Sequence, residues 1–248
     1  METSFTSAGI LALLGLGLVF GLKHATEVDH VVAVSAIVSE HRSVFRSALV
    51  GGLWGVGHTT SLVVVGVVVL VFRAAIPAPV ANWLEFGVAL MIIGLGLLAL
   101  TRVLRRRSDV HVHKHSHDGV SHVHVHFHEA ATRHGQGQPS THTHAVSAIG
   151  IKPLLVGTMH GLAGSGALTL LVLTQIKSAW LGLLYLAIFG VGSIAGMLLM
   201  SGLIGLPFAL TSRNLSGLHH RLQTAAAGLS IAFGLWYAYH TALASGLL

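Results

Sequence analysis

The fold of this chain is decided by one stretch, Gly21-Leu22-Lys23-His24-Ala25-Thr26-Glu27-Val28-Asp29-His30. It places a Lys, two His, a Glu and an Asp between two uncharged apolar runs, Leu11–Phe20 and Val31–Val38. Ionisable side chains at bilayer depth are costly, so they usually face the interior of a helix bundle or an ion pathway. The alternative is a short, solvated polar loop between two membrane helices, which requires no particular side chains. We favour the buried interpretation because the stretch offers metal-binding residue types.

A regular helix cannot direct all of these side chains at one small ion. At about 100° per residue, His24, Glu27 and His30 spread over a broad arc while Asp29 points elsewhere. Either the helix unwinds here, as the discontinuous helices of transporters do, or only some of these residues bind. We therefore predict a metal site that includes His24, Asp29 and His30, with Glu27 as a further candidate.

The composition describes a membrane protein. Of the 248 residues, 53% are hydrophobic and 9% charged, and the mean hydropathy is +0.77. Several apolar runs approach the roughly 20 residues that a membrane-spanning helix needs. We expect an all-α polytopic membrane protein with about six transmembrane helices. The six apolar segments are 8–38, 45–72, 82–104, 147–175, 179–207 and 217–246.

The positive charges orient the chain. Most Lys and Arg lie between the first and second, third and fourth, and fifth and sixth apolar segments, whereas the opposite side has only Arg73 and Lys177. By the positive-inside tendency, the long loop is cytoplasmic and both termini lie outside a bacterial-type cell membrane. If the first segment spans twice, the N-terminus moves inside. The net charge of +6 therefore reflects topology and does not imply nucleic acid.

Two short matches relate the halves of the chain. Gly21–His24 aligns with Gly157–His160 at an offset of 136, and Trp54–His58 with Phe189–Ser193 at an offset of 135. A three-helix repeat has opposite orientations in the membrane, and such inverted repeats bind their substrate where the halves meet. His58 and His160 thus become candidates for the same metal site, although His58 is equally compatible with a cross-helix hydrogen bond. The expected units are 1–104 with the metal motif, 105–146 as a loop, and 147–248.

The spacing of His24, four residues and Asp29-His30 resembles the signature of the nickel/cobalt transporter superfamily. That pattern usually has Asp-Ala directly before the final Asp-His, where this chain has Glu27 and Val28. Gly157–Ala167 resembles the second-half motif of the small urease-accessory permeases of this superfamily. The resemblance covers most of the chain and implies Ni²⁺ or Co²⁺ as the substrate. It also implies a metallochaperone, or urease or hydrogenase maturation proteins, as partners.

The loop at 105–146 is the only long hydrophilic segment and is rich in histidine. Asp118-Gly119 between two alternating runs is a strong hairpin signal, and it pairs His111 with His126, His113 with His124 and His115 with His122. An isolated hairpin is marginally stable, so we expect metal to order it. The alternative is a low-complexity, unstructured metal buffer. The candidate ligands of the loop are His111, His113, His115, His117, His122, His124, His126 and His128.

Together these observations predict a transporter. A site of His and Asp without sulfur fits a first-row divalent cation, carried as substrate and not held as a cofactor. The resemblance of the second-half motif to that of the urease-accessory permeases implies uptake; the first alternative is efflux, with the loop collecting cytoplasmic metal. Two other classes are a membrane metal sensor and an intramembrane metal enzyme, but the chain has no His-Glu-x-x-His pattern. It also has no cysteine and no Gly-x4-Gly-Lys-Ser/Thr nucleotide loop.

Overall fold

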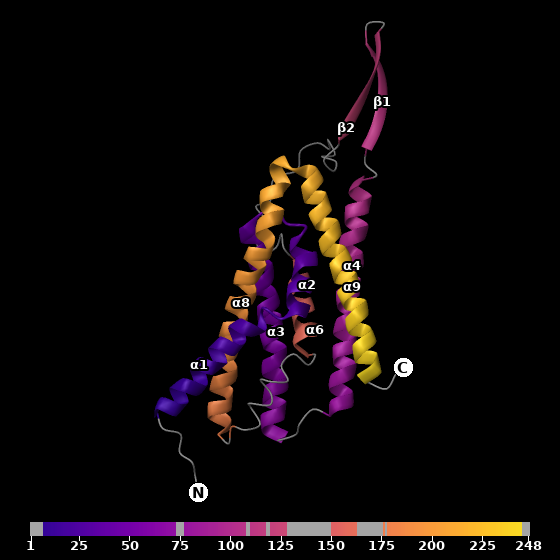
Figure 1. Ribbon diagram of the computed structural model, residues 1–248. Coiled ribbons are helices and arrows are strands. Elements are labelled where there is room, and N and C mark those ends of the chain that lie inside the picture. The colour runs from indigo at the N-terminus through magenta and orange to yellow at the C-terminus, as the bar shows by residue number, and fades with distance from the viewer. Residues whose placement is uncertain are drawn as a thin grey trace, which may run out of the picture.

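The computed structural model describes residues 7–72, 77–107, 110–117, 120–127, 150–162, 176 and 178–244. They form an elongated helix bundle with a β hairpin extending from one end (Figure 1). The helices are α1 (Ser7–His24), α2 (Val28–Val38), α3 (Val44–Phe72), α4 (Ala78–Arg107), α6 (Lys152–Leu162), α8 (Ala179–Asn214) and α9 (Ser216–Ala244).

The helices have the length and the apolar outer surface of membrane-spanning segments. Within the described residues, α1, α3, α4 and α8 are long and apolar enough to cross a membrane, and α9 is as long as α3 but less apolar. Their outer faces are covered with large apolar side chains, of which Val191, Leu203 and Leu210 are each 60% exposed or more. Such a surface is solvated by acyl chains and not by water. The predicted class, an all-α polytopic membrane protein, is confirmed.

The first apolar segment is a broken helix. α1 ends at His24 and α2 begins at Val28. Between them, the backbone N–H groups of Thr26 and Glu27 donate to the carbonyls of Lys23 (2.9 Å) and His24 (3.1 Å). In Figure 1, α2 continues from the middle of the bundle toward the hairpin end. Together the two helices therefore cross the bundle once, and the break between them is one of the two alternatives that the ligand spacing left open.

The two halves of the chain make equivalent contacts between helices. α1 packs against α8, and α6 packs against α3. In the first pair, Gly21 lies against the carbonyl of Phe189, and in the second, Gly157 lies against the carbonyl of Trp54. These are the residues that the two sequence matches align. The same backbone contact is thus made twice, once with each half supplying the glycine.

The pair α4 and α9 also makes reciprocal contacts, in which each helix supplies a glycine that lies against the backbone of the other. A Cβ on Gly96 of α4 would lie 3.0 Å from both the carbonyl oxygen of Ala227 and the nitrogen of Ile231 in α9. A Cβ on Gly234 of α9 would lie 3.2 Å from the carbonyl oxygen of Ala89 and 3.0 Å from the nitrogen of Ile93 in α4. α4 and α9 run in opposite directions, as do α3 and α8 (Figure 1). An inverted repeat has this relation.

The His-rich loop contains the predicted hairpin. β1 (Val110–His117) and β2 (Val120–Phe127) are antiparallel. The predicted register is confirmed, because His111 pairs with His126, His113 with His124 and His115 with His122. Asp118-Gly119 and His128 lie outside the described residues.

Two element boundaries differ from the expectation. α4 continues to Arg107, beyond the start assigned to the loop. Of the predicted segment 147–175, the structure describes a helix only at Lys152–Leu162, and residues 163–175, including the end of the second-half motif, lie outside the described part.

Candidate metal centre

Four histidines and one aspartate converge in the interior of the bundle. His24 ends α1, His30 lies in the first turn of α2, His58 lies in α3 and His160 in α6. Each of the four is at most 3% exposed, and the side chain of Asp29 is 14% exposed. The ring centroid of His30 lies 4.6 Å from that of His24, 5.1 Å from that of His58 and 4.2 Å from that of His160. The structure thus gathers five of the six predicted ligands from both halves of the chain.

Glycines allow the helices that carry these ligands to approach. Gly57 of α3 lies against the carbonyl of Leu154 in α6, and Gly161 of α6 lies against the carbonyl of His58. A side chain at either glycine would hold the two backbones apart. Because Gly57 and Gly161 each adjoin a site histidine in sequence, the same contacts bring His58 and His160 toward the centre.

Glu27 lies outside the cluster and touches it through His24. Its Oε1 lies 3.1 Å from His24 Nδ1, and its side chain is 40% exposed. When Nδ1 donates its proton to this carboxylate, Nε2 keeps its lone pair. His24 Nε2 faces His58 Nε2 at 2.8 Å. Two imidazole nitrogens at this distance share either one proton or one cation.

Asp29 joins the two other histidines. Its Oδ1 accepts from the backbone N–H (2.9 Å) and the Nδ1 (3.0 Å) of His30, and its Oδ2 accepts from His160 Nε2 (2.9 Å). Carboxylates that hold one nitrogen of a histidine fix its tautomer and orient the other nitrogen toward a metal. The remaining nitrogens, His30 Nε2 and His160 Nδ1, are buried with no hydrogen-bond partner in the described part of the chain, as is His58 Nδ1.

Two overlapping groups of three have the spacing of a metal site. His24, His30 and His58 form one group, and Asp29, His30 and His160 form the other. Within each group, the ligand atoms lie within 4.8 Å of one another. His30 belongs to both groups, so a cation that moves from one to the other keeps this imidazole.

The chain is similar along its length to the urease accessory protein UreH of Bacillus sp. (strain TB-90). The two are 35% identical over 238 residues, which cover 96% of this chain and 95% of that protein. The chain belongs to the UreH family. The expected kinship with the urease-accessory permeases of the nickel/cobalt transporter superfamily is thereby confirmed. No family model and no solved structure matches the chain.

Two aromatic rings that were not predicted as site residues line the centre of this UreH-family member. Trp54 is fully buried, and its ring centroid lies 5.6 Å from His160 and 6.4 Å from His30. Phe189, its equivalent in the repeat, lies 5.6 Å from His24. The match of Trp54–His58 with Phe189–Ser193 was the signal that could have identified both rings. Apolar rings against the ligands exclude water, which strengthens electrostatic interactions with a bound cation.

Proposed function

We propose that the chain transports a divalent first-row cation, Ni²⁺ or Co²⁺ or both, across the membrane. The observation that carries this proposal is the buried convergence of four imidazoles and one carboxylate from both halves of the bundle. Imidazole and carboxylate without thiolate suit borderline divalent metals. The relative named as a urease accessory protein supports nickel, the metal of urease. It also supports urease maturation proteins or a metallochaperone as recipients of the ion.

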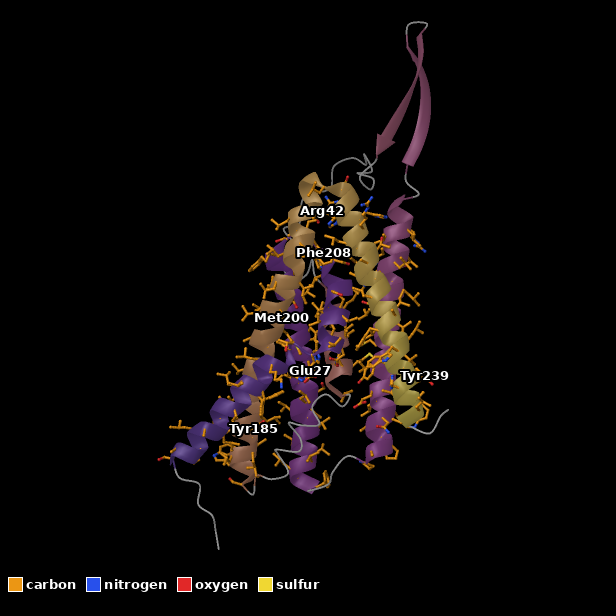
Figure 2. All side chains as sticks on the ribbon, viewed as in Figure 1. Glu27, Arg42, Tyr185, Met200, Phe208 and Tyr239 are labelled. Carbon is orange, nitrogen blue, oxygen red and sulfur yellow. The ribbon has the colours of Figure 1, made fainter. Side chains whose placement is uncertain are left out.

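The position of the centre favours a transported ion over a resident one. The ligands lie at a helix break between two halves of an inverted repeat, where transporters bind their substrates. Glu27, next to this break, is seen midway along the bundle in Figure 2. The two overlapping ligand groups provide successive positions, whereas a structural metal is normally held in one closed shell. We therefore treat the cation as substrate and propose no resident cofactor and no catalysed reaction.

Charges and aromatic side chains support an orientation with the hairpin in the cytoplasm. Arg42 lies near the hairpin end of the bundle (Figure 2), and the basic end of α4 leads into the hairpin. Trp83 and Trp180 are exposed near the starts of α4 and α8, toward the opposite end. Cytoplasmic loops are rich in Lys and Arg, and Trp gathers at membrane interfaces. We propose that both ends of the chain face outward and that the hairpin binds metal in the cytoplasm, outside the transport path.

Metal accumulation by cells tests the function and its direction together. Cells that express the wild type are compared with empty vector for their nickel content. Higher nickel supports uptake, lower nickel supports the efflux alternative, and no difference refutes transport. His24→Asn and His160→Asn are expected to abolish the difference.

His41→Asn serves as the matched control for these variants. His41 lies in the connection between α2 and α3, outside both ligand groups. Partial burial lowers the pKa of the His41 imidazole, so this variant also removes a partly buried histidine. The His41 variant is expected to transport like the wild type. Equal loss in all three variants would show that any lost histidine impairs the protein, and would remove the assignment of the site.

A further inference from the structure

A cavity of about 560 Å³ lies beside the metal centre. Its walls come from the start of α2, from α4 and from the last third of α9, and they include Glu27, Asp29, Glu85, Tyr237 and His240. The parts of α4 and α9 that line the cavity lie toward the end of the bundle remote from the hairpin (Figure 1). Glu85 and His240 are not among the metal ligands predicted from the sequence.

The cavity reaches the metal centre through Asp29. This carboxylate lines the cavity, and it also accepts hydrogen bonds from His30 and His160. Both histidines are 1% exposed, against 14% for the side chain of Asp29. The aspartate is therefore the member of this ligand group through which the centre meets the cavity.

The lining attracts cations. Three carboxylates, those of Glu27, Asp29 and Glu85, and the imidazole of His240 line the space, and the described lining contains no Lys or Arg. A concave site with charges of one sign and apolar walls focuses the electric field and raises the local concentration of counter-ions. The aromatic rings of Tyr237 and its neighbours on α9 supply such walls.

The opposite end of α2 is closed. Gln223 of α9 donates to the carbonyl of Ser39, which follows α2, at 2.8 Å. Arg102 of α4 forms an ion pair with Glu40. Both contacts fasten the α4–α9 pair to α2 at the hairpin end, whereas the cavity separates these helices at the other end. The cavity thus adjoins the metal centre at the end of α2 remote from these two contacts.

We propose that this cavity is the access route between the hairpin-distal face of the membrane and the metal centre. A divalent cation passes along it from Glu85 and His240 to Asp29. The inference rests on the proposed transport function and adds to it the path, the side of access and the groups that the ion meets before its final ligands.

Thiol labelling tests the route, since the chain has no cysteine of its own. Val28→Cys and Ala244→Cys each place one thiol in the lining. Transport by each variant is measured before and after treatment with a membrane-impermeant, cationic thiol reagent from the hairpin-distal side. Labelling is expected to reduce nickel transport at least tenfold, and saturating Ni²⁺ is expected to slow the labelling of Val28→Cys.

Leu235→Cys is the matched control on α9. Leu235 is 57% exposed but does not line the cavity, so treatment is expected to leave its transport unchanged. Val28→Cys that reacts only from the hairpin side, or that transports equally well after labelling, would overturn the route. If such a variant still needs His24 for transport, the proposed function survives without the route. If the wild type transports nothing, the function itself fails.

Charge substitution at Glu85 gives an independent measurement. Glu85→Gln is expected to raise the nickel concentration for half-maximal transport about three- to tenfold, because one attracting charge is lost. Glu85→Asp keeps the charge and is expected to restore most of the affinity. Equal effects of the two variants would indicate a packing role for this side chain and would contradict its role on the path.

Discussion

Gly157→Ala tests how helix packing positions the metal centre. A Cβ at this position would lie 2.9 Å from the carbonyl carbon of Trp54 and closer still to the carbonyl oxygen. Real Cβ atoms do not approach other atoms closer than 3.0 Å, and backbone cannot rotate away as a flexible side chain does. α6 must therefore move away from α3 by about 1 Å. His160 lies one turn further along α6, and its 2.9 Å bond to Asp29 would be lengthened beyond hydrogen-bonding range.

The expected loss of stability follows from the same contact. Overpacking a tight interface costs about 1–3 kcal/mol, while Gly to Ala in a helix interior gains up to about 1 kcal/mol. Gly94→Ala in α4 is the matched control, because a Cβ there meets nothing within 4 Å. Helix propensity cancels between the two variants, so their difference isolates the overpacking. For a chain of this size, it corresponds to roughly 2–12 °C in apparent melting temperature.

Thermal unfolding in detergent and nickel transport in vesicles measure the two effects. Gly157→Ala is expected to melt below Gly94→Ala and to lose most transport, because a ligand is displaced. Gly21→Ala is expected to behave in the same way, since Gly21 makes the equivalent contact with Phe189. A Gly157→Ala protein that melts with Gly94→Ala and transports like the wild type would refute the link between this contact and the site.

Four further predictions concern the ligands and the hairpin. His58→Asn should weaken Ni²⁺ binding by the purified protein at least tenfold in equilibrium dialysis, because the nitrogen that faces His24 at 2.8 Å is replaced; unchanged binding would exclude His58 as a ligand. Asp29→Asn should weaken binding about 10- to 100-fold, because this carboxylate accepts from both His30 and His160; an effect no larger than that of Glu40→Gln would contradict it. Deletion of 109–129 should preserve transport, whereas loss of transport in this variant would favour the sensor alternative. A peptide of residues 109–129 should gain strand signal in far-ultraviolet circular dichroism when Ni²⁺ is added, and no change would remove metal-coupled folding.

The features that could be predicted from the sequence are those that depend on residues close together in the chain or on a match between two short segments. The hairpin register followed from Asp118-Gly119 and the alternation around it, since a two-residue turn leaves one pairing of the flanking strands. The break after His24 was one of two alternatives that ligand spacing allowed, because no regular helix can direct His24 and Asp29 at one ion. The repeat followed from two matches, and the paired contacts of Gly21 and Gly157 explain why these positions carry glycine.

Other features depend on packing between distant segments and leave little local signal. In the sequence, Trp54 is indistinguishable from any other apolar residue of a membrane helix. It lies against His160 only because α6 packs against α3. Glu85 lies near the start of its helix, where a carboxylate is favourable beside any helix N-terminus. Its place in a cavity with Asp29 depends on how α4 and α9 diverge from α2. Glu27 was a candidate ligand from its neighbours in sequence, but the turn directs it to the outer nitrogen of His24.

The repeat is nearly symmetric in its backbone contacts and strongly asymmetric in its ligands. His24 has His160 as its equivalent, but His58 is matched by Ser193, and Asp29-His30 by Ser165-Gly166. Four of the five ligands therefore belong to the first half. His160 to Asp29 is the hydrogen bond that joins the halves within the described centre. In the proposed function, a movement that separates His160 from Asp29 would take one imidazole away from the bound ion. We therefore propose that release of the ion requires the loss of His160 alone, while the other four groups stay together on the helices of the first half.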